Sequence, residues 1–395
     1  MKKVICLLLA ALILLGTAVG IVISKNKAAD ADGTDTSVIV EPNGEEDGGE
    51  TAAPVEDTPV EAAPAFDYAK AYAKYNPDTV VLTANGKPVT WAAYFGSIYY
   101  YINYFAQYGL VSDFDAAITE DQTYGEYFKN TAEQEFRQRM SVLKLGEKHG
   151  LEVNDEEIDD ALNVMIEYYM GAESTEEDLV EMLSENYMTL EDYRDSMRAN
   201  AMQEKLYVEL FGADSEKVSE EDALAYLNDH DFITATHILV MTKNMQTGED
   251  LSDDEKAAAK EKIESIYNEL KTIKDKDKLL KRFNELKTEY CEDTGKAAYP
   301  DGYVFTKGQM VEPFESTAYS LKEYELSEIV ESPYGYHIIL RLPQNPAISM
   351  TTGAGTARQA AAEEQFSALV VDAMEDCEVI YSNGFDTLDL KELFA

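Results

Sequence analysis

The sequence predicts an α+β protein in which a small α+β domain is inserted into a mostly α-helical module. Amphipathic helical patterns with capping signals dominate residues 67–231, whereas residues 232–342 begin and end with β-type runs and hold helices between them. A last helix and strand within residues 343–395 are too small to form a core of their own. We therefore expect this C-terminal segment to pack on the N-terminal helical module.

Length and composition exclude several classes of function. At roughly 150 residues per domain, 395 residues indicate two or three domains. The chain has 33 Lys and Arg against 76 Asp and Glu, a net charge of −43 that argues against binding to nucleic acid. A hydrophobic content of 45% is too high for a disordered protein. Three cysteines, Cys6, Cys291 and Cys377, match neither a disulfide framework nor a zinc pattern. We expect no metal and no cofactor.

The N-terminus predicts a segment that enters a membrane. Two lysines precede an uncharged run from Val4 to Ile23, which is long enough as a helix to cross about 30 Å of hydrocarbon. Ala18 and Gly20 give only a weak cleavage site, and the apolar run continues beyond them. We therefore interpret residues 1–27 as a transmembrane or signal segment and favour a retained anchor, although the sequence leaves cleavage open.

Residues 28–66 predict a disordered acidic linker. The segment is rich in acidic residues, contains four prolines and has no Lys or Arg, so it cannot bury enough apolar surface to offset its ordering entropy. An anchor, an acidic spacer and a folded body together are typical of a protein that works outside the cytoplasm. The predicted location is the cell membrane with the folded part extracytoplasmic, or secreted if the first segment is cleaved.

Residues 67–231 predict a helical module that begins with a hairpin. A tight Asn85-Gly86 turn joins a strand at residues 79–84 to a short return strand. Thr90 can cap the next helix, whose apolar residues recur at spacings of three and four. Further helices are expected after the capping signals at Asn154, Ser174 and Thr189. The tyrosines of this module either offer an aromatic surface to unfolded clients or belong to its core, and its acidity either steers cationic chains or maintains solubility.

Residues 232–342 predict the order β-α-α-β-α-β, with strands at 233–241 and 336–342. Two of the four histidines, His237 and His337, lie in these two strands, and alternation allows both rings to point inward from neighbouring strands. With Asp293 in a turn-rich loop, they suggest a hydrogen-bonded cluster. Each histidine taken alone is more often structural, and no H-x-H or H-x-D pair fixes metal ligands on one strand.

Four ordered motifs resemble the parvulin family of peptidyl-prolyl cis-trans isomerases. They are THIL (236–239), YCED (290–293), FTKGQMVEPFESTAYSL (305–321) and SPYGYHII (332–339). The surrounding chain is similar to extracytoplasmic foldases of the PrsA and SurA type, in which the isomerase domain is inserted in a chaperone module built from both chain ends. The resemblance implies an antiparallel sheet with surrounding helices, isomerase and chaperone activity toward exported polypeptides that contain X-Pro bonds, and a homo-oligomer as an open possibility.

The resemblance also implies the site residues. The family's paired histidines fall on His237 and His337, and its active-site aspartate or cysteine falls on Asp293 rather than on the adjacent Cys291. Ser332 matches a hydroxyl position near the second histidine. The proline pocket falls on three apolar residues, Met310, Val311 and Phe314.

One motif departs from the family pattern. Parvulins usually carry Gly-Gly-Asp-Leu-Gly before the aromatic strand, whereas this chain has Tyr299-Pro-Asp-Gly-Tyr303. The apolar residue that helps to wall the pocket becomes Gly302. The departure bears on substrate range and catalytic strength more than on the fold. It leaves a second hypothesis, in which a catalytically weak parvulin-like domain sits in a client-holding chaperone or scaffold.

Overall fold

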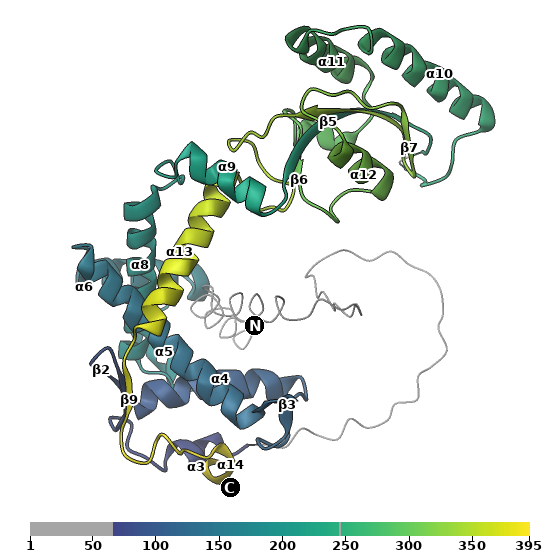
Figure 1. Cartoon of the computed structure of the whole chain (residues 1–395). Helices are drawn as coiled ribbons and strands as arrows, with labels where there is room; N and C mark the ends of the chain where they lie inside the picture. The colour runs from purple at the N-terminus through teal and green to yellow at the C-terminus, as the bar shows by residue number, and fades with distance from the viewer. Residues whose placement is uncertain (1–65, 245) are drawn as a thin grey trace, which may run out of the picture. The chain divides into compact units, whose positions relative to one another are not determined.

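The structure is a computed structural model that describes residues 66–395 apart from residue 245 (Figure 1). The predicted anchor, and all but the last residue of the predicted acidic linker, lie outside the described residues. Within the described part, no helix is long and apolar enough to cross a membrane. The chain divides into two compact units: unit 1 runs up to Leu206 and includes Ser367–Ala395, and unit 2 is Tyr207–Phe366. The predicted domain boundaries at residues 231 and 342 stay a prediction.

Unit 1 is mostly helical, as its amphipathic patterns predict. Its helices are α3 (Tyr68–Tyr72), α4 (Trp91–Gln107), α5 (Tyr124–Lys148), α6 (Asp155–Met165), the π-helix η1 (Ile166–Met170), α7 (Glu176–Ser184), most of α8 (Leu190–Phe211), the second half of α13 (Ala357–Glu375) and α14 (Leu390–Leu393). A two-stranded ribbon joins β3 (Ala117–Thr119) to β4 (Gln122–Thr123).

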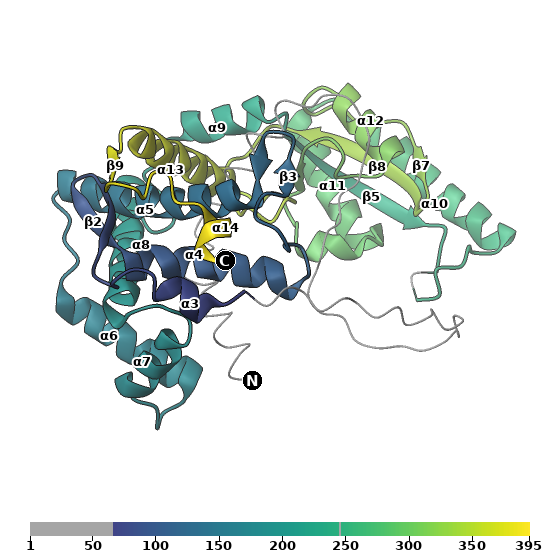
Figure 2. The ribbon, with the colours of Figure 1, turned by 90° about the horizontal axis from the view of Figure 1, so that it is seen from below.

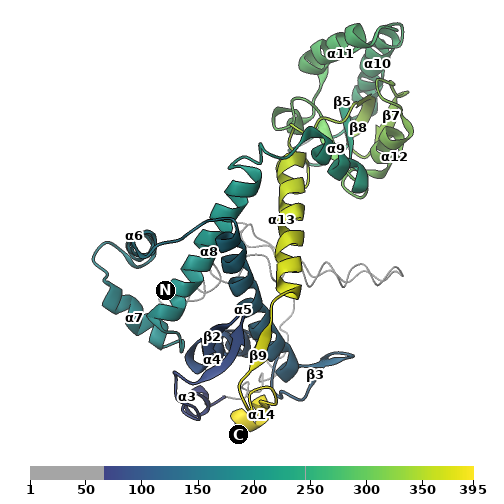
Figure 3. The ribbon, with the colours of Figure 1, turned by 60° about the vertical axis from the view of Figure 1, so that its left-hand side comes forward.

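A three-stranded antiparallel sheet joins the two ends of unit 1. The strands β1 (Val80–Ala84) and β2 (Lys87–Thr90) form the predicted hairpin, and the positive φ values at Asn85 and Gly86, 49° and 77°, fit a tight turn of the favoured hand. The strand β9 (Val379–Tyr381) pairs with β1 on its other side, and Figure 3 shows it between α13 and α14. The C-terminal segment therefore completes a sheet that the N-terminal segment begins.

The core of unit 1 is built on α4. Trp91, Phe95, Ile98 and Ile102 lie at spacings of three and four and are all fully buried, because this stripe faces the interior. Five residues that follow α13 belong to the same hydrophobic cluster: Cys377, Phe385, Leu388, Leu390 and Leu393. The tail thus packs on the N-terminal helices through apolar side chains as well as through β9.

The helix starts follow the capping signals, with one correction. Asn154 caps α6 in a reciprocal capping box with Glu157, and Thr189 bonds Asp192 in the same manner at the start of α8. The cap of α7 is Thr175 and not the predicted Ser174. The Thr175 side chain accepts a hydrogen bond from the Asp178 N–H, whereas the Ser174 hydroxyl donates to the Met170 carbonyl at the end of η1.

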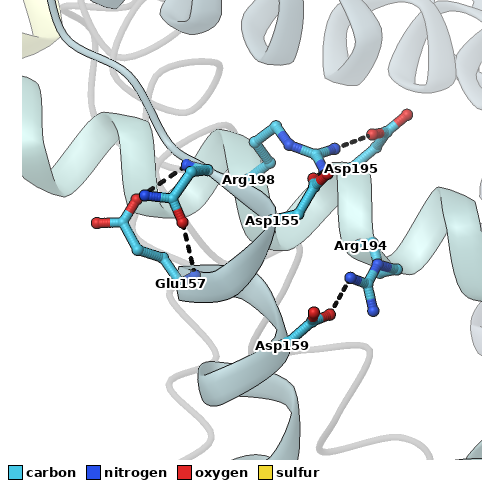
Figure 4. A network of polar contacts seen from close by, with 7 residues as sticks. Asp155, Glu157, Asp159, Arg194, Asp195 and Arg198 are labelled. Atoms are coloured by element: carbon cyan, nitrogen blue, oxygen red, sulfur yellow. Dashed lines mark hydrogen bonds and ion pairs between the residues drawn. The ribbon is translucent and has the colours of Figure 1, made fainter.

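Polar contacts connect α6 to α8 across unit 1 (Figure 4). Arg194 pairs with Asp159, and the Arg198 guanidinium lies 2.8 Å from Asp155 and 2.5 Å from Asp195. These side chains are partly exposed, so each pair contributes little to stability. Apolar residues of the same two helices, including Leu162 of α6 and Tyr193 of α8, belong to one hydrophobic cluster.

Unit 2 holds a four-stranded antiparallel sheet in the order β6-β5-β8-β7. The strands are β5 (Ile233–Met241), β6 (Tyr303–Phe305), β7 (Val330–Ser332) and β8 (Gly335–Leu342), and Figure 2 shows β5, β8 and β7 side by side. The helices are α9 (Glu220–Asp229), α10 (Asp253–Leu270), α11 (Lys276–Tyr290), the 3-10 helix η2 (Thr294–Ala297) and α12 (Glu312–Ser320). The order agrees with the sequence prediction except for β7, which adds a strand of three residues.

The two faces of this sheet bury different helices. Even-numbered residues of β5 and β8, such as Ile238 and Ile338, pack with α10 and α11, and Figure 1 shows these two helices on one face. Odd-numbered residues such as Ala235 and Ile339 pack with Phe314 of α12 on the other face. The strand alternation therefore sends His237 and His337 to the face that α12 covers.

Candidate active site

The two histidines of unit 2 meet on one face of the sheet. In the antiparallel register His237 stands opposite Ile339, and His337 stands opposite Leu239, so the histidines are diagonal neighbours on β5 and β8. Their ring centroids are 5.3 Å apart, with the planes at 70°. Both side chains are buried, with 8% of His237 and 4% of His337 exposed. The structure thus brings together the pair that strand alternation predicts.

Asp293 reaches the same place from the loop after α11. It caps η2, and its Oδ1 accepts a hydrogen bond from the Gly295 backbone N–H at 2.9 Å. Its Oδ2 accepts a hydrogen bond of 2.5 Å from the Tyr303 hydroxyl and lies 3.3 Å from His237 Nε2. Because the acceptor is a carboxylate, the bond from the Tyr303 hydroxyl is a charge-assisted one. Asp293 therefore has both a structural partner and a place beside the imidazoles.

The electrostatics of the cluster favour an ionised Asp293 and a neutral His337. Burial opposes ionisation of Asp293, but its contacts with His237, Tyr303 and the Gly295 N–H outweigh burial and lower the pKa of the carboxyl below its ordinary value. Burial, reinforced by His237, lowers the pKa of His337 to about 3. At neutral pH, His337 is therefore an uncharged ring.

Ser332 joins the cluster from β7. Its Oγ lies 2.7 Å from His337 Nε2 and accepts a hydrogen bond from the Tyr334 backbone N–H at 3.1 Å. The other ring nitrogen, His337 Nδ1, has no hydrogen-bond partner among the described residues, nor does His237 Nδ1, whereas His237 Nε2 faces Asp293 Oδ2. Buried polar atoms usually have partners, so the two Nδ1 atoms mark a place where a polar group of a bound molecule can bind.

The apolar side of the site comes from α12 and the loop before it. Phe314 is 3% exposed, and its ring stands edge-on to both imidazoles, with centroids 5.1 Å from His237 and 5.5 Å from His337. Met310 and Val311 are partly buried against the same cluster. The Glu315 carboxylate accepts hydrogen bonds from the backbone N–H groups of Gly308 and Met310, at 2.8 and 3.2 Å, and so fixes the loop that carries Met310.

Cys291 has a different place from Asp293, although the two are close in sequence. Its buried Sγ accepts a hydrogen bond from the Leu239 N–H at 3.4 Å and donates to the His237 carbonyl at 3.7 Å. Burial raises the pKa of this thiol, which makes it a poor nucleophile at neutral pH. Cys291 therefore ties the end of α11 to the β5 backbone. Among the described residues, no group of three His, Cys, Asp or Glu side chains is placed to hold a metal ion.

The sequence prediction missed Tyr303. Its ring is stacked almost parallel to His237, with centroids 5.5 Å apart and planes at 8°. Tyr303 pairs with Ala235 and shares a face with Phe305, so the pairing of β6 with β5 brings it into the site. The preceding Gly302 has a φ of 108°, and a Cβ there would lie 3.0 Å from the Ala235 carbonyl oxygen. A side chain at residue 302 would therefore be strained in this chain.

Solved structures similar to this chain include a PrsA protein and a parvulin. PrsA from Bacillus subtilis is 23% identical and covers 67% of this chain and 92% of that chain, with a TM-score of 0.24. The parvulin NmPin of Nitrosopumilus maritimus is 33% identical and covers 28% of this chain and 96% of that chain, with a TM-score of 0.20. The foldase protein PrsA of Staphylococcus aureus strain Newman is 32% identical over 197 residues, which are 49% of this chain and 54% of that protein. The chain thus spans about half the length of this relative.

Two family models match separate parts of the chain. Residues 67–207 match the SurA-like N-terminal domain, and residues 237–342 match the PPIC-type PPIase domain, also named rotamase. The second match begins at His237, ends with the last residue of β8, and contains Asp293, Phe314 and His337. The chain therefore combines a PPIC-type PPIase domain, the domain of parvulin-type peptidyl-prolyl isomerases, with a SurA-like N-terminal domain.

Proposed function

We propose that this chain catalyses cis-trans isomerisation of X-Pro bonds in exported polypeptides and holds these polypeptides while they fold. In this proposal residues 232–342 are the isomerase domain, inserted in a chaperone module that is built from residues 67–231 and 343–395. Residues 1–27 attach the protein to the cytoplasmic membrane, and the folded part works outside the cytoplasm.

The chemistry requires no bond to form or break. Rotation about an X-Pro amide has a barrier of about 18 to 20 kcal/mol because twisting removes the amide resonance. Lowering this barrier by about 4 to 7 kcal/mol would accelerate the rotation roughly 10³- to 10⁵-fold. A site that binds the twisted amide better than the planar one supplies this difference, so no covalent intermediate is needed.

The observation that carries the proposal is the meeting of one apolar side chain with three polar ones. Phe314 lies edge-on to both His237 and His337, and Asp293 Oδ2 lies 3.3 Å from the His237 ring. In our proposal Phe314, with Met310 and Val311, holds the prolyl ring. The polar groups, His237, Asp293, His337 and Ser332, then face the rotating amide.

The twisted amide has properties that these polar groups suit. When the amide twists, its nitrogen becomes pyramidal and its resonance with the carbonyl is lost. Fixed dipoles and a fixed charge can therefore bind the twisted amide more tightly than the planar ground state. The unpartnered Nδ1 atoms of His237 and His337 belong to rings that provide such dipoles. Asp293, kept ionised by its contacts, provides the charge.

A proline-isomer assay on the full chain tests the proposal. We expect wild type to accelerate the isomerisation of an X-Pro peptide, and His237→Ala, Asp293→Ala and Phe314→Ala each to lower kcat/KM at least tenfold. His230→Ala is the matched control, since His230 also belongs to unit 2 but lies apart from the cluster, with its ring 3.1 Å from Glu364. A wild-type rate equal to the background, or site variants with the rate of the control, would refute the isomerase function.

Exposed aromatic residues support the second hypothesis, that of a client-holding chaperone. At the end of α4, Tyr104, Tyr108 and Leu110 are exposed, with 67% of Tyr108 accessible. Large apolar side chains grouped on a surface favour contact with unfolded chains. If holding is independent of catalysis, Tyr108→Ser with Tyr104→Ser reduces suppression of client aggregation, whereas His237→Ala does not. The reverse pattern would assign client protection to the isomerase site.

A further inference from the structure

Tyr303 occupies a position where the family pattern has a small residue. In the motif before β6, Gly302 takes the place of the leucine and Tyr303 takes the place of the last glycine. The bulky side chain is thus displaced by one position along the chain. Because Tyr303 pairs with Ala235 in the sheet, its side chain lies on the face of β5 that also carries His237.

Two contacts tie Tyr303 to the polar half of the site. Its ring covers the His237 ring in a parallel stack, and its hydroxyl donates to Asp293 Oδ2. That oxygen also faces His237 Nε2, so one phenol contacts both members of the His237–Asp293 pair. Without the hydroxyl, the Gly295 N–H would hold only the other carboxylate oxygen, Oδ1.

We propose that Tyr303 is a positioning residue of the isomerase site, which fixes the Asp293 carboxylate and the His237 ring relative to each other. The proposal rests on the proposed function and names a residue outside the set implied by the family resemblance. Tyr303 acts through Asp293 and His237. In this chain its ring also supplies the bulk that Gly302 lacks.

The other titratable groups around Asp293 have to be considered beside Tyr303. The titratable groups that face the carboxylate are His237 from β5, His337 from β8, Tyr303 from β6, Cys291 after α11, and Lys287 of α11. Lys287 Nζ donates to the Pro300 carbonyl at 3.1 Å. Burial and the adjacent carboxylate raise the pKa of the Tyr303 hydroxyl, so it is protonated at neutral pH and can donate to Asp293.

A double-mutant cycle on the full chain tests the proposal. We expect Tyr303→Phe, which keeps the stacked ring, to lower kcat/KM about tenfold through kcat with little change in KM, because a hydrogen bond to a charged group is lost away from the prolyl ring. In an Asp293→Asn background the same change should alter kcat/KM less than about twofold. Tyr299→Phe removes a hydroxyl from the ring that neighbours Tyr303 and should match wild type.

A substitution at Gly295 gives a second test, in which the Tyr303 hydroxyl is crowded instead of removed. A methyl group at this residue would overlap the Tyr303 hydroxyl oxygen, and the backbone of Gly295 does not have a positive φ. Gly295→Ala should therefore lower kcat in wild type and have a smaller effect in Tyr303→Phe, where the overlapping atom is gone. Equal effects of Gly295→Ala in both backgrounds, or additive effects of Tyr303→Phe and Asp293→Asn, would overturn the positioning role.

The same cycle can be measured without catalysis. Hydrogen exchange of β5 and β8 amides in the four proteins of the Tyr303 and Asp293 cycle reports whether the two side chains stabilise unit 2 as a pair. An inactive wild type would refute the proposed function, and coupled exchange would then still support the Tyr303–Asp293 contact. An active wild type with no coupling in either measurement would refute only the role of Tyr303.

Discussion

Replacing His337 by Gln should remove a defined part of the pH dependence of unit 2. Burial lowers the pKa of His337 from 6.5 to about 3 in the folded chain, and only 4% of its side chain is exposed. As the pH falls below 6.5, the unfolded chain binds a proton at this residue, but the folded chain does not bind one until about pH 3. The stability of the fold therefore decreases as the pH is lowered through this window.

The size of the effect follows from the same two values. Between pH 7.5 and 5.5, proton binding to His337 stabilises the unfolded chain by about 1.4 kcal/mol, the free energy that corresponds to one pKa unit. The free energy of unfolding should therefore fall by the same amount. Gln carries no charge at either pH. His337→Gln will have a constant offset in stability from lost contacts such as that with Ser332, but it will lack this change with pH.

Hydrogen exchange of the β8 amides is the appropriate assay, because peptides from each unit are measured separately. At a given pH the intrinsic exchange rates cancel between wild type and variant. We expect the ratio of wild-type to variant exchange rates for Gly335–Leu342 to rise about tenfold from pH 7.5 to 5.5. Peptides from β1 should show no such change. A ratio for β8 that is constant over this range would refute a buried, neutral His337.

Two further predictions concern unit 1. Phe385→Ala should destabilise this unit by about 3 to 4 kcal/mol, measured by urea titration with the fluorescence of Trp91, the single tryptophan, because Phe385 is buried and its ring centroid is 6.1 Å from that of Trp91. Ile380→Ala, at a position 56% exposed, is its control and should stay within about 0.5 kcal/mol; equal losses would contradict docking of the tail through Phe385. Arg194→Ala should cost less than about 1 kcal/mol in the same titration, because its pair with Asp159 is partly exposed, and a loss of several kcal/mol would show that the α6–α8 contact depends on this pair.

Sequence patterns were sufficient where the physical cause is local. The helix face of Trp91, Phe95 and Ile98 follows from a periodicity that a single helix contains, and the histidine pair follows from alternation within two long strands. The cap of α7 was misplaced by one residue, because Ser174 and Thr175 can both cap and each is followed three residues later by an acidic residue.

The features of the site that the residues alone could not establish depend on contacts between segments that are distant in the sequence. The approach of Asp293 to His237 depends on how the loop after α11 returns to the sheet, which no pattern in that loop encodes. Tyr303 and β7 were missed for the same reason. Tyr303 lies in β6, and both β6 and β7 have only three residues, too few for an alternating pattern to be recognised. The family resemblance indicated Asp293, but it has glycine at the position of Tyr303 and so could not indicate this residue.

The pairing of β1 with β9 sets the order in which the two units can complete their folds as the chain emerges from its N-terminal end. Translation completes Tyr207–Phe366 as one uninterrupted stretch, so this unit has all its strands before the final residues are made. β1, near the beginning of the folded part, must wait until Val379–Tyr381 emerge before it gains its second neighbour. The earlier-synthesised half is thus the later one to finish, because its sheet stays incomplete until the last part of the chain is available.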